Sequence, residues 1–409
     1  MSFESSDPRI SSQLLLISNI LLEIFFVIGF NTPGNKAEIE SGFFLFFFME
    51  INNIKNKLTS KVKKLWTNQV IGWYQKNKRD LVWRSKENQD FYSIWLSEVM
   101  LQQTSVKTVE NYFIKFKKKW PDLDSFLNAK LDEILFIWQG MGYYQRAKNI
   151  FKTLQILKKI KINRPLEYDE LIKLPGIGTY TAASISAILS DENHAVVDGN
   201  IKRIISRCCN INYREKNGMK LLNSKAQELT PNIGNRYYCQ SLMDIGSTIC
   251  KPQNPKCKIC PLATFCDFFI NQRKEAKLTS VPKRKKIGIT YIFMNGNSFF
   301  LEKSKDKLLN GLLRFPLSEL VILNNNKKIE KIRTDIINNE LKIIENIEHY
   351  EELGEINHKF SGFDLNLIIV KVLLCNKILR YNGIWLDEKN LYKYPLSKLM
   401  VKILGEVLK

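Results

Sequence analysis

The pattern of hydrophobic and polar positions divides the chain into a helical part and a smaller mixed part. From Met49 to about Arg273, apolar residues recur at intervals of three and four, which predicts helices joined by short loops containing Pro or Gly. The clearest predicted helices are Val62–Tyr74, Tyr92–Gln103, Val106–Phe116 and Leu131–Trp138. No convincing strand pattern interrupts them, so we predict an all-α domain over residues 49–273.

The pattern changes after a basic segment at residues 274–286, which contains Pro282 and is interpreted as a linker. Beyond it, Ile287–Phe293 and Phe299–Leu301 read as strands on either side of a turn at Asn295-Gly296. A further strand is predicted at Leu365–Leu374 and an amphipathic helix at Leu396–Leu408. The predicted second domain, residues 287–409, is therefore a smaller α/β unit.

Residues 1–48 do not match the rest in composition. They carry two basic and five acidic residues, which gives a net charge of −3. The remaining residues carry +24, so the whole chain has a net charge of +21. The apolar run Leu14–Phe30 is shorter than the roughly 20 residues of a membrane span and is interrupted by polar residues. It also lacks the basic flank of a secretory signal. We expect translation to start naturally at Met49, and residues 1–48 to be a dispensable extension.

Charge points toward a polyanionic partner. Lys and Arg number 62 against 41 Asp and Glu, which gives a net charge of +21. Such an excess favours nucleic-acid binding through neutralised phosphates, although a lysine-rich solvated surface would give the same composition. With only three histidines, a His-based zinc site or a Ser-His-Asp triad is not expected. We expect a monomer that binds no membrane.

Four of the eight cysteines cluster with metal-ligand spacing. Cys250, Cys257, Cys260 and Cys266 form the pattern C-x6-C-x2-C-x5-C, which suits either zinc or an iron–sulfur cluster. Zinc modules usually present two C-x2-C pairs, and only one is found here, so the spacing favours the larger cluster. The remaining cysteines are predicted to be plain buried thiols: Cys208, Cys209, Cys239 and Cys375.

A glycine hairpin and an aspartate complete the candidate chemistry of the helical part. Leu174–Ala182 reads L-P-G-I-G-T-Y-T-A, in which Gly176 and Gly178 allow a tight turn between two helices. Backbone N–H groups at the start of the second helix could meet a DNA phosphate. Twenty residues past Gly178, Asp198 lies in V-D-G-N beside a turn, where a lone Asp is ordinarily only a cap.

Together these features resemble the endonuclease III superfamily of helix-hairpin-helix DNA glycosylases. Three further motifs are similar to those of the MutY-type adenine DNA glycosylases: Leu81–Arg84 (L-V-W-R, with Val82 in place of a proline), Trp95–Thr104 (W-L-S-E-V-M-L-Q-Q-T) and Gly140–Ala147 (G-M-G-Y-Y-Q-R-A). The resemblance is dense over roughly residues 60–270. It implies a bacterial cytoplasmic enzyme at the nucleoid, or an organellar or nuclear one in a eukaryote.

The resemblance also implies roles for individual residues. Glu98 would protonate adenine at N7, and its place on an apolar helix face would raise its pKa. Asp198 would stabilise the positively charged sugar, supported by Tyr180 and Asn200. The cysteine loop would hold a [4Fe–4S] cluster. The residues expected to contact DNA are Trp83, Arg84 and Leu101 in the base pocket, Gln103 and Tyr143 at the DNA stack, Gly176 and Gly178 at the backbone, and also Gln102.

One position separates the two branches of the superfamily. Enzymes that also cleave the strand carry a lysine two residues past the second hairpin glycine, and this chain has Tyr180 there. Without an amine, no Schiff base can form with the sugar. We therefore expect a monofunctional glycosylase that releases adenine from duplex DNA containing A:8-oxoguanine or A:G mispairs.

The C-terminal part resembles the Nudix-like recognition domain of the family. Leu308–Pro316 matches its G-L-x-x-F-P stretch, but the acidic box that binds Mg²⁺ for pyrophosphate hydrolysis is not found. The family's lesion-reading F-S-H loop corresponds to Phe360, Ser361 and Gly362, so Ser361 remains and the histidine is replaced. We expect a weaker preference for 8-oxoguanine over guanine.

Three alternatives compete with this interpretation. An endonuclease III-like glycosylase and lyase for oxidised pyrimidines is disfavoured by Tyr180. A non-catalytic iron–sulfur DNA-binding protein is disfavoured because Glu98 and Asp198 are both retained. A nucleotide hydrolase is disfavoured by the missing acidic box.

Overall fold

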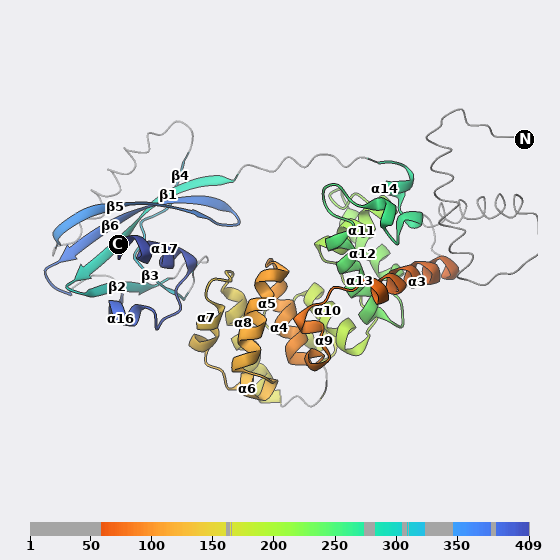
Figure 1. Ribbon diagram of the computed structural model, residues 1–409, viewed down its shortest axis with the longest axis horizontal. Coiled ribbons are helices and arrows are strands. Elements are labelled where there is room, and N and C mark those ends of the chain that lie inside the picture. Colours follow the sequence, from red (N-terminus) through yellow and green to blue (C-terminus); the bar gives the residue numbers. More distant parts are fainter. Residues whose placement is uncertain are drawn as a thin grey trace, which may run out of the picture. The chain divides into compact units, whose positions relative to one another are not determined.

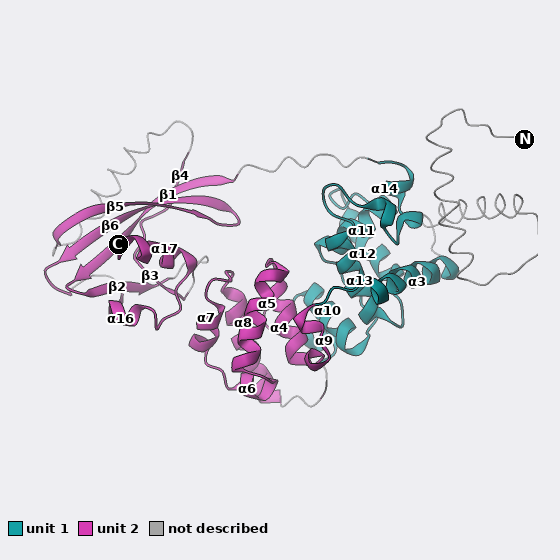
Figure 2. Cartoon of the chain, viewed as in Figure 1, with its two compact units in different colours: residues 1–80, 165–172, 178–276 teal, residues 81–164, 173–177, 277–409 magenta. Residues whose placement is uncertain are grey.

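The computed structural model describes residues 59–160, 164, 166–273, 283–304, 309, 311–323, 347–377 and 382–408. The chain separates into two compact units (Figure 2), and each is described by itself. Unit 1 comprises residues 1–80, 165–172 and 178–276, and unit 2 comprises residues 81–164, 173–177 and 277–409. The expected extension 1–48 and the start at Met49 lie outside the described residues.

Unit 1 is built from helices in its described part (Figure 1). They are α3 (Ser60–Asn77), α9 (Tyr168–Leu171), α10 (Thr179–Ser190), α11 (Gly199–Cys209), α12 (Gly218–Leu229), α13 (Asn235–Thr248) and α14 (Asp267–Ile270), with short 3-10 turns at Cys257–Ile259 and Ala263–Phe265. Helix α3 buries Val62, Trp66, Val70 and Tyr74, which lie four residues apart on one face. The Trp66 indole donates to the Tyr238 hydroxyl of α13 at 2.9 Å, so the two helices are joined in the core.

The first helices of unit 2 lie between residues 81 and 160. They are the 3-10 turns η1 (Val82–Arg84) and η2 (Lys86–Asn88), then α4 (Phe91–Leu101), α5 (Val106–Lys119), α6 (Leu123–Leu127), α7 (Leu131–Trp138) and α8 (Gln145–Ile160). An aromatic cluster forms their core, in which Phe116 packs edge-on against both Phe126 and Trp138. Helix α4 buries nine consecutive residues, Tyr92–Met100, because other helices surround it.

In its described residues, unit 2 continues with a seven-stranded sheet. Its strands are β1 (Arg284–Asn295), β2 (Ser298–Lys303), β3 (Leu313–Arg314), β4 (Val321–Ile322), β5 (Ile347–Lys359), β6 (Phe363–Leu374) and β7 (Gly383–Asp387). The order is β3-β2-β1-β6-β5, with β4 paired to β1 and β7 to β2. The long central pair, β1 and β6, is parallel, whereas β1–β2 and β5–β6 are antiparallel.

Both faces of the sheet are apolar. On one face, Leu365, Leu367 and Ile369 of β6 join a cluster with helix α17 (Lys398–Val407) and the short α16 (Glu388–Leu391). On the other face, β6 contributes Ile368, Val370 and Val372. They pack in one cluster with alternate residues of β1: Ile287, Ile289, Tyr291 and Phe293. The alternation of side chains along each strand explains why the two clusters use odd and even positions.

Most predicted elements are confirmed, with local differences. The β1–β2 turn at Asn295-Gly296 is present, with Asn295 paired to Ser298 and Gly296 at φ +55°. Strand β1 begins at Arg284, so the last residues of the predicted linker 274–286 are strand, and the rest of it lies outside the described residues. Helix α4 ends at Leu101, so the expectation that Gln102 and Gln103 are helical is wrong.

Within the described ranges, no helix is both long and apolar enough to cross a membrane.

Candidate active site and DNA interface

Glu98 is a buried carboxyl on helix α4. Its residue is only 5% exposed, and its neighbours in the helix include Trp95, which is 1% exposed. Asp90 caps the helix by accepting from the Ser93 amide at 2.9 Å. A carboxyl on a fixed and buried helix is held in one place, which a group that delivers a proton to a substrate requires.

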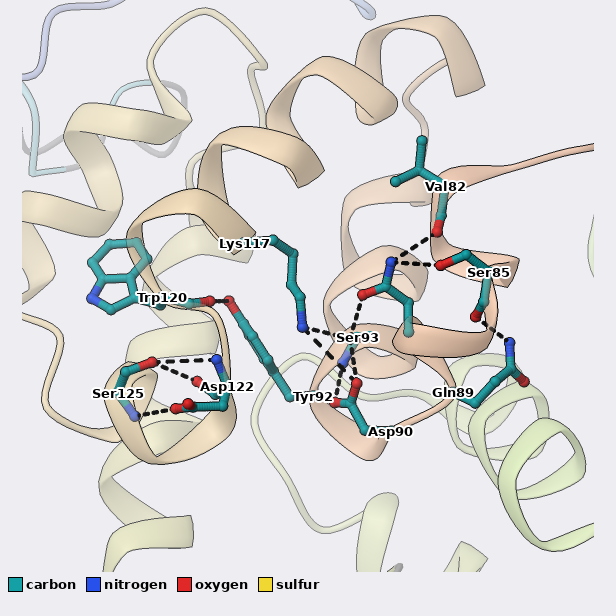
Figure 3. A network of polar contacts seen from close by, with 11 residues as sticks. Val82, Ser85, Gln89, Asp90, Tyr92, Ser93, Lys117, Trp120, Asp122 and Ser125 are labelled. Atoms are coloured by element: carbon teal, nitrogen blue, oxygen red, sulfur yellow. Dashed lines mark hydrogen bonds and ion pairs between the residues drawn. The ribbon is translucent and has the colours of Figure 1, made fainter.

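A polar network fixes the first turn of α4 and the segment before it (Figure 3). Lys117 of α5 donates to the Ser93 hydroxyl at 3.0 Å, and Ser93 in turn bonds Asp90 at 2.6 Å. The Asn88 amide donates to the Val82 carbonyl at 2.9 Å. The network therefore connects the L-V-W-R segment to the helix that carries Glu98.

The three residues predicted to line the base pocket differ in exposure. Trp83 is 4% exposed and packs edge-on against Phe113 with ring centroids 6.0 Å apart. Arg84 and Leu101 are half-buried. Trp83 thus lies in the core, whereas Arg84 and Leu101 are more accessible.

The glycine hairpin joins α9 to α10 as the sequence predicts. Gly176 has φ +81°, and a Cβ there would lie 2.7 Å from the Asn149 side chain, so both its conformation and its surroundings require glycine. Gly178 takes ordinary extended backbone and caps the N-terminus of α10. Tyr180 is the second residue of α10 and is half-buried.

Asp198 caps helix α11 and is held by two contacts. Its carboxylate accepts from the Ile201 amide at 2.6 Å and from the Asn200 side-chain amide at 2.8 Å. Arg203 donates to the Asn200 Oδ1 at 2.9 Å and to the Cys250 carbonyl at 2.7 Å. A chain of hydrogen bonds therefore runs from Asp198 through Asn200 and Arg203 to the first cysteine of the cluster motif.

The four motif cysteines line one cavity in unit 1, together with Cys208 and Arg207. Arg207 of α11 is 6% exposed, and its guanidinium donates to the Cys250 Sγ at 3.1 Å and to the Lys251 carbonyl at 2.8 Å. Among the described residues, no group of three or more His, Cys, Asp or Glu side chains could hold a single metal ion as arranged.

Burial dominates the acidity of most of these thiols. It raises the pKa of Cys250 and Cys257, and raises the pKa of Cys260 to about 12. The pKa of Cys266 is lowered instead, because it accepts a hydrogen bond from the Cys208 thiol. Cys208 is thus buried, as predicted, and also contacts a motif cysteine. Cys209 and Cys239 are buried too, but the prediction for Cys375 is wrong, since it is exposed just beyond the end of β6.

The predicted DNA-stack residues lie in two short loops of unit 2. Gln103 follows α4 with φ +59°, and Tyr143 precedes α8 with φ +49°; both are exposed on the surface. Gln102 donates to the Gly176 carbonyl at 3.3 Å and so ties the first loop to the hairpin. Left-handed backbone is uncommon for residues other than glycine, and two such positions in adjacent motifs point to a functional constraint.

The F-S-G segment forms the turn between β5 and β6. The Phe360 amide donates to the Phe363 carbonyl at 2.9 Å, which closes the turn and leaves Ser361 and Gly362 exposed at its tip. A Cβ built on Gly362 has no atom within 4 Å, so a side chain fits there. His358, the nearest histidine in the sequence, packs against Phe360, with ring centroids 4.6 Å apart.

The structure thus brings Asp198 and Asn200 together, and gathers the four cysteines in one cavity. Glu98 belongs to unit 2 and Asp198 to unit 1. Sequence reasoning missed the structural roles of Arg146, Arg203 and Arg207. Arg146 and Arg207 are buried cations, and Arg146 lies inside the quoted motif Gly140–Ala147, which could have drawn attention to it. A helix-hairpin-helix DNA glycosylase is the class of protein that this fold and site define.

Comparison with known proteins agrees with that class. Residues 96–231 match the family described as HhH-GPD superfamily base excision DNA repair protein. The adenine DNA glycosylase of Buchnera aphidicola from Schizaphis graminum is 35% identical over 351 residues, covering 82% of this chain and 96% of the relative. The human adenine DNA glycosylase is 34% identical over 207 residues, or 48% of this chain and 38% of that protein. A thermostable thymine-DNA glycosylase of known structure aligns with a TM-score of 0.46 at 26% identity, covering 51% of this chain and 97% of that one.

The chain belongs to the adenine DNA glycosylase family. It is therefore a DNA N-glycosylase, a hydrolase of base excision repair.

Proposed function

We propose that this enzyme hydrolyses the N-glycosidic bond of adenine mispaired with 8-oxoguanine or guanine in duplex DNA, without cleaving the strand. The observation that carries the proposal is the buried carboxyl of Glu98 on a helix whose buried residues are otherwise uncharged and mostly apolar. Adenine leaves slowly unless its ring is protonated, and burial disfavours the charged form of a carboxyl. Glu98 is the acid that donates this proton to adenine N7.

Asp198 stabilises the positive charge that develops on the sugar as adenine departs. Its oxygens are oriented by the Asn200 amide and the Ile201 N–H, so the negative charge is preorganised and needs no rearrangement during the reaction. Tyr180 and Asn200 hold the attacking water or a phosphate of the substrate. Because Tyr180 has no amine, the products are adenine and an intact strand with an abasic site.

The two exposed loops and the hairpin bind the duplex. Gln103 and Tyr143 enter the stack when adenine is flipped out, which offsets part of the unstacking cost of a few kcal/mol. Arg84 and Leu101 surround the extruded base, and Trp83 supports this part of the pocket from the core, where it packs against Phe113. Gln102, Gly176 and the Gly178 end of α10 contact the backbone near the flipped nucleotide, where helix N-terminal amides favour a phosphate.

We also propose that Cys250, Cys257, Cys260 and Cys266 hold a [4Fe–4S] cluster. In such a cluster each thiolate binds a different iron, so the sulfurs need to line one cavity and not to converge on one ion. Their shared cavity and the Arg207 contact to the Cys250 Sγ support this donor set. When bound, the cluster supplies a cross-link of the loop that follows α13. The hydrogen bonds from Arg203 to the Cys250 carbonyl and to Asn200, and from Asn200 to Asp198, then connect this loop to Asp198 and hold its carboxylate in position.

Replacing Cys257 with serine is expected to remove the cluster. The full chain should bind about four iron atoms and absorb visible light, and the variant should lose both, because serine is a poor ligand for this soft site. Cys375→Ser, which removes an exposed thiol elsewhere, should keep both. Iron analysis and the visible spectrum of anaerobically purified protein measure the effect, and one zinc per chain without iron would refute the cluster.

The β5–β6 turn is proposed to read the base opposite adenine, with Ser361 as the remaining polar side chain. A side chain that hydrogen-bonds a base contributes about 1–3 kcal/mol of discrimination, and Gly362 offers only backbone. Preference for 8-oxoguanine over guanine is therefore reduced but not lost.

Installing the missing side chain as Gly362→His should raise the ratio of adenine excision from A:8-oxoguanine over A:G by about 5- to 150-fold, the factor that corresponds to about 1–3 kcal/mol. The turn can accept it, since a Cβ there meets no other atom within 4 Å. Gly405→His, at an equally open position on α17, is the matched control and should leave the ratio unchanged. Single-turnover rates on the two duplexes give the ratio. If Gly362→His leaves it unchanged or lowers it, this turn does not read the lesion.

A further inference from the structure

Arg146, the second residue of α8, is a buried cation whose contacts converge on the end of another helix. The residue is 7% exposed. Its Nη1 donates to the carbonyl oxygens of Val99, Met100 and Gln102 at 3.0, 2.7 and 2.6 Å. These carbonyls belong to the last turn of α4 and the residue after it, where no further helical amide is available to them.

This helix end is a suitable environment for a buried guanidinium. The carbonyl groups at a helix C-terminus carry partial negative charge, which compensates a nearby cation. Burial lowers the pKa of Arg146 to about 10, so the side chain still carries its charge at neutral pH. The contacts therefore remain in place under physiological conditions.

The same side chain also contacts the second DNA-stack loop. Its Nη2 donates to the Thr104 hydroxyl at 2.9 Å and to the Gly142 carbonyl at 3.4 Å. The guanidinium lies 5.1 Å from the ring centroid of Trp138 and 5.4 Å from that of Tyr143. One side chain thus spans the residues on both sides of Gln103 and the residues around Tyr143.

Other bonds fix the second loop but do not reach the first. The Trp138 indole donates to the Gly142 carbonyl at 2.9 Å, and the Gly140 amide donates to the Tyr144 hydroxyl at 3.1 Å. Arg146 is the residue that joins the two loops in these contacts. The left-handed backbone of Gln103 and Tyr143 costs free energy, and it persists only where the surroundings impose it.

We propose that Arg146 is a positioning residue that holds Gln103 and Tyr143 as one rigid wedge before DNA arrives. The inference rests on the proposed role of these two residues in the DNA stack. A wedge already ordered in the free enzyme loses less conformational entropy on insertion, so more of its binding free energy remains to extrude adenine. Arg146 itself touches neither base nor sugar in this proposal.

The test is a double-mutant cycle between Arg146→Lys and Tyr143→Ala in the full chain. Lysine keeps the charge but cannot span both loops, because it lacks the planar fork of donors. We expect Arg146→Lys alone to lower the single-turnover rate of adenine release roughly tenfold. In the Tyr143→Ala background the same substitution should lower the rate by less than about twofold. A difference of this size is usual for coupled residues that are in contact. Arg236→Lys is the matched control, since Arg236 donates to the Leu189 carbonyl in unit 1 and should leave the rate unchanged.

Two further readouts separate positioning from a general loss of structure. Fluorescence of 2-aminopurine beside the target adenine reports unstacking, and it should rise less with Arg146→Lys than with the wild-type enzyme. The melting temperatures of Arg146→Lys and Arg236→Lys should be similar. Multiplicative losses in the double mutant, or normal fluorescence with Arg146→Lys, would overturn the inference. Absence of adenine release by the wild type would instead refute the proposed function, and a fully active Tyr143→Ala would refute the wedge.

Discussion

Replacing Glu98 with glutamine is expected to lower adenine release by about 10²–10⁴-fold, the usual effect of losing a general acid. Glutamine has nearly the same shape and can occupy the same buried position on α4, but it cannot donate the proton that adenine needs. Duplex binding should persist, because Glu98 is buried in the helix and contributes no charge contact to phosphate.

The matched control is Glu87→Gln, a change of the same kind at an exposed position of the nearby turn η2. Single-turnover excision and equilibrium binding should both be unchanged for Glu87→Gln, whereas Glu98→Gln should separate the two measurements. Excision by Glu98→Gln within a few-fold of wild type would remove Glu98 from the mechanism.

Replacing Asp198 with asparagine is expected to lower the rate by about 10²–10³-fold, the effect of removing one preorganised electrostatic contact to a transition state. Asparagine caps a helix about as well as aspartate, so α11 should keep its N-terminus and the fold should be retained. What the variant loses is the negative charge facing the sugar.

Asp122→Asn provides the control, because Asp122 caps α6 in the same way by accepting from the Ser125 amide at 2.8 Å. Both variants should melt near the wild-type temperature, and only Asp198→Asn should be slow. Equal rates for the two variants would leave Asp198 as a helix cap without a catalytic role.

Much of the helical part follows from sequence periodicity, because helices such as α3, α5 and α7 bury one face at intervals of three and four residues. The hairpin and the cap at Asp198 also follow from local signals, namely glycine, proline and an aspartate before a helix. Such features depend only on residues that are close together in the sequence, and they can therefore be predicted from the sequence alone.

Strand β5 is the clearest element that sequence reasoning missed. Ile347–Lys359 is rich in glutamate and buries only Ile356, so it shows neither the alternation nor the composition of a buried strand. Among the described strands it pairs with β6 alone, at the edge of the sheet, and β6 supplies most of the apolar surface. Exposed edge strands are often charged, which hides them from pattern analysis.

The end of α4 could not be predicted for a different reason. Nothing in M-L-Q-Q-T marks a helix stop, since no glycine, proline or asparagine is present. Where the helix ends, its last carbonyl groups accept hydrogen bonds from Arg146, which lies more than forty residues later in the chain. Arg146 also contacts Gln102 and Thr104, the two neighbours of the left-handed Gln103, and such a long-range contact leaves no signal in the local sequence.

The most direct test of the central claim is excision by the full chain on duplexes containing A:8-oxoguanine, A:G and A:T pairs, analysed with and without alkali. The account predicts adenine release from both mispairs and little from A:T, with strand breaks only after alkali treatment, because Tyr180 offers no amine for a Schiff base. Strand breaks without alkali, together with covalent trapping by borohydride, would contradict it.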